Sequence, residues 1–232
     1  RLSQFSADLA HDLRTPIGNL LGEAQVALSR RRTEGEYQSV LASSVEELER
    51  INRMIEGMLF LARTDNVQAS LDLQTLDAAA EVDRLIEYYE GPAAEAGVAV
   101  RRAGALALQA DAALFRRAIS NLLANAIAHS TPRGEITVTL HAELDGGGEI
   151  AVTNSGPGIP PQALPRVFDR FFRVDASRLD SAKGSGLGLA IVKSIVELHG
   201  GGVEAQSEPG ALTTFRMFFP RPASVTTPVA QQ

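Results

Sequence analysis

Cysteine is absent from the 232-residue sequence, which excludes disulfide scaffolds and metal sites built on thiolates. Basic residues are outnumbered, because 22 Lys and Arg stand against 28 Asp and Glu and give a formal net charge of −6. Phosphate backbones are held by clustered Lys and Arg, so this balance disfavours a nucleic-acid partner and we expect none. The short basic runs at 30–32 and 101–102 are expected to be solvated surface.

Long apolar runs are also missing. None reaches the roughly 18 residues that a membrane-spanning helix needs, and no signal-peptide pattern is present. The chain nevertheless starts at Arg1, without an initiator methionine, in the middle of a helical pattern. We therefore expect a fragment of a longer protein, and the missing membrane segment says little about that parent.

Several familiar site motifs are missing as well. The glycines at 184, 186 and 188 are spaced G-x-G-x-G and follow a polar loop, which argues against the dinucleotide-binding pattern G-x-G-x-x-G. No G-x-x-x-x-G-K-[ST] motif occurs, so a P-loop protein is excluded. The four histidines show no H-E-x-x-H spacing, which leaves that zinc motif out.

Two stripes of apolar residues over positions 1–66 predict two long helices. The first stripe has three- and four-residue steps through Leu9, Leu13, Ile17, Leu20, Ala24 and Leu28, and the second runs through Leu41, Val45, Leu48, Ile55, Leu59 and Ala62. A polar break at 30–35 joins the helices into an antiparallel hairpin. One hairpin is too thin to cover both stripes, so we expect two copies to pair in a dimeric four-helix bundle.

The pattern becomes mixed after a polar linker at 65–70. The sequence predicts these further elements: a helix over 75–96, strands at 98–100 and 106–108, a helix from an N-cap at Asp111 to about His129, a hairpin of 136–140 with 150–152, a helix over 187–199, and strands at 203–207 and 213–219. The expected class is two domains. An all-α hairpin at 1–66 is followed by an α+β sandwich at 71–222, a mixed sheet backed by helices, and by a disordered tail at 223–232.

The stretch AHDLRTP, at 10–16, places a histidine before a carboxylate and a proline inside a predicted helix. At about 100° per residue, His11 is turned away from the apolar stripe and faces solvent. A surface histidine without a function is the simplest interpretation of that geometry, but Asp12 can fix the ring tautomer and make the other nitrogen a better nucleophile. Pro16 lacks an N–H and is expected to kink the helix one turn later. Thr15 lies on the same side as His11, where it can position a water.

A second group of residues indicates a phosphate site. Asn121 and Asn125 are four residues apart on a predicted helix, so both amides point to one place, where a carbonyl oxygen can ligate Mg²⁺. The glycines of GSGLGLAIVK, at 184–193, lie where a loop enters a helix whose backbone N–H groups can bind phosphate. Taken singly, the asparagines are also consistent with a helix cap, and NSGPGIP at 154–160 with a plain loop.

Five segments taken in order resemble the sequence boxes of bacterial sensor histidine kinases. They are FSADLAHDLRTP, NLLANAIAHS, NSGPGIP, FDRFFR and GSGLGLAIVK, which resemble the H, N, G1, F and G2 boxes, and the resemblance extends to about Pro222. The amino-acid sequence of these boxes is most similar to the branch of the family that senses copper, silver and zinc. The resemblance implies a dimerisation and phosphoacceptor domain of the HisKA type followed by an ATP-binding domain of the Bergerat type. It also implies the cytoplasmic portion of an inner-membrane protein that is anchored upstream of Arg1.

The resemblance implies an activity as well. ATP and Mg²⁺ would serve autophosphorylation on His11, and the phosphoryl group would pass to an Asp of a response regulator receiver domain. Asp12 is implied as the base beside His11, and Thr15 as the residue that aligns water for dephosphorylating the regulator. The implied nucleotide residues are Asn121, His129 and Lys183 near the phosphates, Asn125 on Mg²⁺, Asn154 on the adenine, Gly156 and Gly158 in that wall, Phe168 and Phe172 anchoring a lid, Arg173 at the γ-phosphate, and Gly184, Ser185, Gly186, Leu187, Gly188 and Thr213 completing the pocket.

Three positions depart from the family pattern. Asn154 stands where Asp is usual; its amide oxygen can still accept from the adenine amino group, so we expect weaker or altered nucleotide affinity rather than loss. Ala128 replaces a basic residue, and Leu212 replaces a glycine. Two alternatives to a kinase stay open. One is an ATPase of the same superfamily that never phosphorylates itself, and the other is a nucleotide-responsive dimeric scaffold without catalysis.

Overall fold

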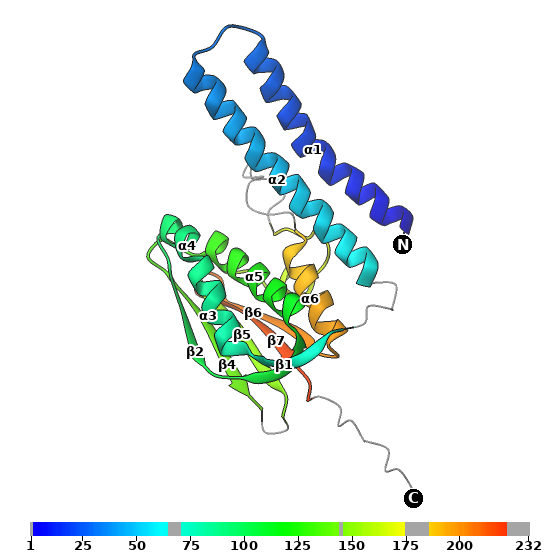
Figure 1. Cartoon of the computed structure of the whole chain (residues 1–232), viewed down its shortest axis with the longest axis vertical. Coiled ribbons are helices and arrows are strands. Elements are labelled where there is room, and N and C mark those ends of the chain that lie inside the picture. The colour runs from blue at the N-terminus through cyan, green and yellow to red at the C-terminus, as the bar shows by residue number, and fades with distance from the viewer. Residues whose placement is uncertain (1, 65–70, 144–145, 175–185, 222–232) are drawn as a thin grey trace, which may run out of the picture. The chain divides into compact units, whose positions relative to one another are not determined.

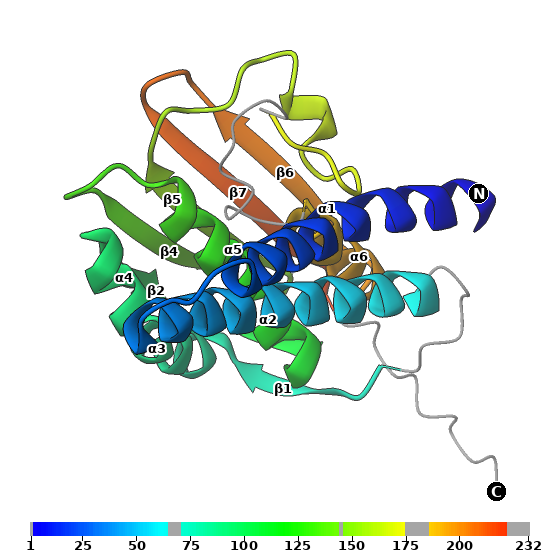
Figure 2. The ribbon, with the colours of Figure 1, turned by 90° about the horizontal axis from the view of Figure 1, so that it is seen from above.

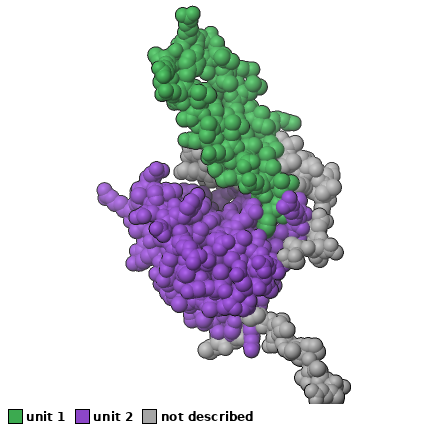
Figure 3. Space-filling view, viewed as in Figure 1, with its two compact units in different colours: residues 1–60 green, residues 61–232 purple. Residues whose placement is uncertain are grey.

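The computed structural model describes residues 2–64, 71–143, 146–174 and 186–221, with only the helical backbone for residues 2–12. The chain divides into two compact units, Arg1–Phe60 and Leu61–Gln232, which have different colours in Figure 3. The linker expected at 65–70, most of the polar loop expected after Val174 and the expected tail at 223–232 lie outside the described residues. Within the described residues, no helix is both long enough and apolar enough to span a membrane.

The first unit is built from a helical hairpin. Helix α1 (Leu2–Leu28) and helix α2 (Glu34–Thr64) lie side by side and are joined by a short turn (Figure 1). These bounds confirm the two helices predicted from the apolar stripes. Helix α1 continues through Pro16, whose side chain is buried.

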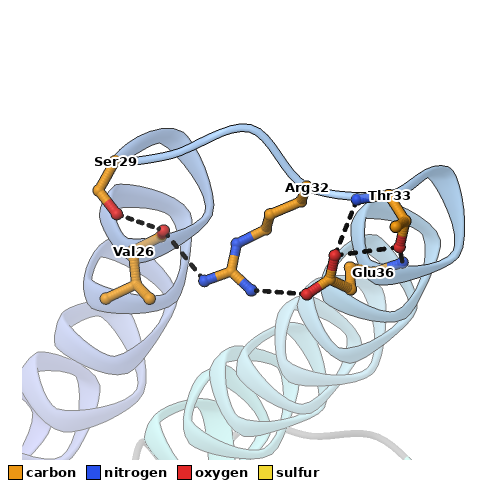
Figure 4. A network of polar contacts seen from close by, with 5 residues as sticks. All are labelled: Val26, Ser29, Arg32, Thr33 and Glu36. Carbon is orange, nitrogen blue, oxygen red and sulfur yellow. Dashed lines mark hydrogen bonds and ion pairs between the residues drawn. The ribbon is translucent and has the colours of Figure 1, made fainter.

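The turn of the hairpin is held by side chains from both helix ends (Figure 4). Thr33 and Glu36 form a capping box, in which the Thr33 N–H donates to Glu36 Oε2 at 2.8 Å and the Glu36 N–H donates to Thr33 Oγ1 at 3.3 Å. The hydrogen bonds from Thr33 lower the pKa of the Glu36 carboxyl from its ordinary value. Arg32 Nη2 and Ser29 Oγ donate to the Val26 carbonyl oxygen at 3.2 Å and 2.9 Å. Arg32 Nη1 also pairs with Glu36 Oε1 at 3.5 Å, so one guanidinium group links the last turn of α1 to the first turn of α2.

Both apolar stripes are largely uncovered in the single chain. Their most exposed large side chains among the described residues are Leu28 at 81%, Leu41 at 65%, Leu48 at 55%, Val45 at 54%, and Ile17 and Leu59 at 52% each. Leu41, Val45, Leu48 and Leu59 recur at helical spacing and therefore lie on one face of α2. Exposed apolar residues grouped in this way favour association with another surface.

The second unit contains a five-stranded mixed sheet with helices on one face (Figures 1 and 2). The strand order is β2 (Ala99–Gly104), β4 (Glu135–Ala142), β5 (Gly148–Ser155), β7 (Leu212–Phe219) and β6 (Gly202–Ser207). Strand β2 is parallel to β4, and the other neighbours are antiparallel. In the described part of this unit the helices are α3 (Ala78–Tyr88), α4 (Glu90–Ala96), α5 (Ala112–His129) and α6 (Gly188–Leu198), and Leu164–Arg166 forms a 3₁₀ turn. The predicted α+β sandwich of a mixed sheet backed by helices is confirmed.

Buried and exposed residues alternate along β4, so one face of the sheet is covered by the helices. Ile136, Val138 and Leu140 of β4 are buried under the helices, whereas the residues between them are partly or fully exposed. Helix α5 begins where the sequence predicts, because the Asp111 carboxylate accepts the N–H groups of Ala113 and Leu114 at 3.0 Å and 3.1 Å. Its buried face packs Phe115, Ala118, Ile119, Leu122, Leu123 and Ala126 onto the core. This packing sets the orientation of the opposite face of α5.

The predicted helix over 75–96 was wrong at its start and in its continuity. Residues Leu73–Asp77 form strand β1, which pairs antiparallel with β3 (Ala107–Asp111) in a separate two-stranded sheet. Leu76 is buried opposite Leu108 in this pair. The helix starts only after Asp77, which caps it, and it is divided at Tyr89 into α3 and α4. The strand depends on a partner that lies 30 or more residues further along the chain, so local periodicity carries no sign of it.

Candidate functional site

Helix α5 carries the two predicted asparagines on one side. Both Asn121 and Asn125 are half-buried. The amide nitrogen of Asn121 donates to the Arg117 carbonyl oxygen at 2.8 Å, which holds the amide in one orientation. A Cβ placed on Gly188 would lie 3.2 Å from Asn121 Oδ1. The structure thus brings together the asparagine helix and the first residue of α6, which the sequence analysis assigned to one phosphate site.

Gly186 lies against the backbone of Phe171. Its φ is +68°, and a Cβ there would lie 2.8 Å from the Cα and carbonyl carbon of Phe171. The Gly186 carbonyl oxygen also accepts the Phe171 N–H at 2.9 Å, and Phe171 itself has a positive φ of 61°. Only glycine fits this position without displacing the chain. Leu187 is fully buried beside it, whereas Lys183, Gly184 and Ser185 lie outside the described residues.

A buried polar wall forms at the end of β5. Asn154 is 2% exposed and faces Thr213, which is 5% exposed, across the β5–β7 pair. The Asn154 amide nitrogen donates to the Ser155 carbonyl oxygen at 3.3 Å. Thr213 Oγ1 lies 2.7 Å from Ser207 Oγ, which accepts the Ile159 N–H at 2.9 Å. An uncharged amide suits such a site because burial of an unpaired carboxylate is costly.

The loop after β5 fits between the end of α5 and the β6–β7 turn. The Gly156 N–H donates to the Ala211 carbonyl oxygen at 3.2 Å, and a Cβ on Gly156 would lie 2.4 Å from the carbonyl oxygen of His129. Gly158 has a φ of +77°, and a Cβ there would lie 2.4 Å from the Glu208 carbonyl oxygen. The two predicted glycines are therefore sites of close backbone approach, and His129 lies beside the first of them.

The FDRFFR segment is held by its aromatic rings. Phe168 packs edge-on against Phe215 of β7, with the ring centroids 6.0 Å apart. The Arg166 guanidinium lies over the Phe172 ring, 4.7 Å from its centroid. Arg173 follows directly and is exposed. Phe168 is thereby packed on β7, Phe172 is held by a residue six positions before it, and Phe171 between them is bonded to Gly186.

The predicted phosphoacceptor lies on helix α1. The structure gives the backbone of His11 and Asp12 as helical, and their side chains lie outside the described residues. Thr15 is exposed, one turn further along α1. The three residues therefore share one helix of the first unit, while every nucleotide residue of the described part lies in the second.

The donor set of the second unit fits Mg²⁺ bound together with phosphates. Over the described ranges, no group of three or more His, Asp or Glu side chains is placed to hold a metal ion by itself. Mg²⁺ usually takes one or two protein oxygens and completes its shell with substrate phosphates and water. The half-buried amide of Asn125 offers such an oxygen on the same side of α5 as Asn121.

Sequence reasoning missed some contacts that shape this site. Phe171 was passed over, although its positive φ and its hydrogen bond to Gly186 define the loop. Ser207 was also missed, because its partners Thr213 and Ile159 come from separate segments. His199 was treated only as the end of a helix. The sequence Leu-His-Gly-Gly indicated only that a helix ends there. The contact of the His199 ring with Asp111 joins segments far apart in the chain, so the sequence alone carried no sign of it.

Comparison with known proteins gives the class of this chain. Residues 1–67 match the model of the His Kinase A (phospho-acceptor) domain, and residues 110–223 match that of the histidine kinase-, DNA gyrase B- and HSP90-like ATPases. The chain therefore joins a phospho-acceptor domain to an ATPase domain of that class. It belongs to the sensor histidine kinase family, and the resemblance noted in the sequence is confirmed.

Three similar proteins illustrate the match. The sensor protein IrlS of Burkholderia pseudomallei (strain K96243) is 52% identical over 225 residues, which are 97% of this chain and 48% of IrlS. The structure of the mycobacterial sensor histidine kinase MprB is 34% identical, with a TM-score of 0.56 over 65% of this chain and 100% of that chain. Histidine kinase ThkA, in complex with response regulator protein TrrA, shares the fold at 20% identity, with a TM-score of 0.76 over 95% of this chain and 62% of that chain. The chain spans about half the length of the curated relatives it matches.

Proposed function

We propose that this chain is the kinase portion of a two-component sensor. It transfers the γ-phosphoryl group of ATP to His11 and then to an aspartate of a response regulator. The observation that carries the proposal is the approach of Gly188 to Asn121, which sets the start of a helix beside an oriented amide. Backbone N–H groups at a helix start bind phosphate oxygens, and an amide oxygen beside them suits a hydrated cation. The matched phospho-acceptor domain supplies the histidine that such a site would serve.

The proposed first step is an in-line displacement at the γ-phosphorus. An imidazole nitrogen of His11 attacks, an N–P bond forms, the bond to the β-phosphate oxygen breaks, and ADP leaves. The proton displaced from the imidazole passes to Asp12. Arg173 faces the γ-phosphate, and His129 and Lys183 add positive charge where Ala128 offers none. Asn125 would hold Mg²⁺, which would supply positive charge against the phosphates.

The remaining residues bind the nucleotide in this proposal. Asn154 accepts a hydrogen bond from the adenine amino group, and Thr213 lies across the strand pair from it. Gly156 and Gly158 let the wall of the base site pack tightly against α5 and the β6–β7 turn. The phosphates are covered by the loop of Gly184, Ser185, Gly186, Leu187 and Gly188, while Phe168 and Phe172 anchor the preceding segment.

The proposed partner is the receiver domain of a response regulator. The solved complex of ThkA with response regulator protein TrrA, a protein of the same fold, supports this assignment. Thr15, exposed one turn after His11, would align water for removing the phosphoryl group from the regulator. We further propose a parent protein in the bacterial inner membrane, with this portion in the cytoplasm and a heavy-metal stimulus. Support comes from the sequence resemblance and from relatives about twice as long as the chain.

The homodimer is proposed from the exposed stripes of the hairpin. Leu41 is 65% exposed and is expected to be buried in a four-helix bundle with a second copy. Leu41→Glu should therefore convert the chain to a monomer, because a carboxylate is costly in an apolar interface. Light scattering after gel filtration measures the mass. Ala42→Glu, about 100° further round the helix, is the matched control and should stay dimeric; a dimer of Leu41→Glu would contradict this interface.

Labelling with ATP tests the proposed activity. Incubation of the chain with γ-labelled ATP and Mg²⁺ should yield a phosphoprotein that is labile in acid and stable in base, and chelation with EDTA should prevent it. Added receiver domain should then take the label. Steady release of inorganic phosphate without a phosphoprotein would indicate the non-phosphorylating ATPase. ATP binding in calorimetry without any turnover would indicate the scaffold, and either result would contradict the kinase.

A further inference from the structure

We propose that His199 is a positioning residue of the ATP site. It sets how far α6 lies along α5, and thereby places Gly188, the first residue of α6, beside Asn121. The inference rests on the proposed function only in taking residues 186–188 as part of the phosphate site. The evidence is the hydrogen bonding of the His199 ring and the spacing of two contacts along the helices.

The His199 ring joins the end of α6 to the start of α5. Its Nε2 lies 3.1 Å from the backbone nitrogen of Asp111, the N-cap residue of α5. A backbone N–H can only donate, so Nε2 is the acceptor and carries no proton. The proton is therefore on Nδ1, which donates to the Ile195 carbonyl oxygen at 2.7 Å. One tautomer satisfies both partners.

The ring also packs edge-on against Phe219, with the ring centroids 5.5 Å apart. Phe219 in turn lies 6.2 Å from Phe115 of α5. The junction thus combines a directional hydrogen bond with an aromatic contact, and the two can be removed separately by mutation. Asp111 completes the junction, because its carboxylate accepts the Asp72 N–H at 3.3 Å as well as the first N–H groups of α5.

Two contacts fix the position of α6 along α5, which lie side by side (Figures 1 and 2). Gly188 meets Asn121 at one end, and His199 meets Asp111 at the other. At about 1.5 Å per residue, the two separations are about 16 Å on α6 and about 15 Å on α5, so the contacts are in register on antiparallel helices. The contact of Gly188 with Asn121 allows the helices to approach closely, but it is not a directional bond and does not oppose sliding of one helix along the other. The His199 bond is directional and opposes sliding of α6.

Sliding of α6 would move the phosphate-binding groups. The backbone N–H groups of residues 186–188 act on phosphate only when they are aimed at it, and small displacements weaken such contacts steeply. A net hydrogen bond contributes about 1 kcal/mol, which corresponds to about a fivefold change in an equilibrium constant. Loss of the Asp111–His199 bond should therefore weaken ATP binding about fivefold. The reaction at saturating ATP should be nearly unchanged, because bound nucleotide restores the loop.

A pair of amide variants isolates the acceptor. His199→Gln places an amide oxygen near the position of Nε2, whereas the shorter His199→Asn reaches only the position of Nδ1. Both lose the ring, so their difference reports the bond to Asp111. We expect His199→Asn to raise the KM for Mg-ATP about fivefold with kcat within twofold, and His199→Gln to restore the KM to within twofold of the parent. Phe219→Leu removes the aromatic contact and should lower the melting temperature without raising the KM.

The outcomes separate this role from a structural one. An unchanged KM in His199→Asn, or the same rise in His199→Gln, would overturn the proposal, as would a rise of that size in Phe219→Leu. Should His199→Asn fail to fold, His199→Phe takes its place. Phenylalanine keeps an aromatic ring at this position but has no hydrogen-bond acceptor, so the same rise in the KM is expected. The dissociation constant of Mg-ATP, measured by calorimetry on the same variants, follows the same order. This binding measurement tests the positioning role even if the parent chain forms no phosphohistidine.

Discussion

Replacing His11 by alanine is expected to reduce the acid-labile phosphate on the chain to background. No other residue is proposed to form the N–P bond, and a methyl group cannot replace the ring nitrogen as nucleophile. Binding of ATP should be unchanged, because every described nucleotide residue lies in the second unit, beyond helix α1. The measurements are γ-phosphate labelling with an acid wash and the dissociation constant of Mg-ATP from calorimetry.

His141→Ala is the matched control for this loss. It makes the same substitution at an exposed histidine of β4, on the part of the sheet away from the nucleotide residues, and should leave labelling at the parental level. Asp12→Asn should give an intermediate rate, because the nucleophile is kept and only the proton acceptor is lost. Persistence of acid-labile, base-stable phosphate in His11→Ala would disprove the assignment of the phosphoacceptor.

Alanine at Gly186 is expected to raise the dissociation constant of ATP at least about tenfold while the chain stays folded. A φ of +68° costs an L-residue about 1–2 kcal/mol. The added Cβ would also lie 2.8 Å from backbone atoms of Phe171, so the loop must move away from its position before α6. Both effects act at the loop proposed to cover the phosphates. Calorimetric titration with Mg-ATP measures the change, and circular dichroism checks the fold.

Gly97→Ala is the matched control for Gly186→Ala. Gly97 has the same φ of +68°, but the nearest atom to its Cβ is the Arg133 nitrogen at 4.0 Å, and it ends helix α4 far along the chain from the loop. The control should lose a similar amount of stability and keep its affinity for ATP. Equal affinities in the two variants would show that the close approach to Phe171 does not position the phosphate-binding loop.

Local patterns predicted most of the elements of this fold. The apolar residues of α1 and α2 recur every three or four positions within each helix, so both helices can be predicted from local sequence without any tertiary contact. Asp111 was recognised as an N-cap for the same reason, because it bonds to the residues that follow it directly. Strand β1 was missed because its partner β3 lies far along the chain, and the nearby apolar residues also fit a helical spacing.

The candidate site divides in a similar way. The residue types and their order along the chain, from the histidine of α1 to the glycines before α6, already indicated phosphate chemistry, because helix spacing and loop composition are local properties. Only packing decided that Gly186 meets Phe171, that Asn154 lies buried opposite Thr213, and that His199 accepts from Asp111. Each of these contacts joins segments that are far apart in the chain and are brought together by packing of the core. The burial of these side chains and the distances between them arise only when the segments pack together, so the sequence of one segment cannot predict them.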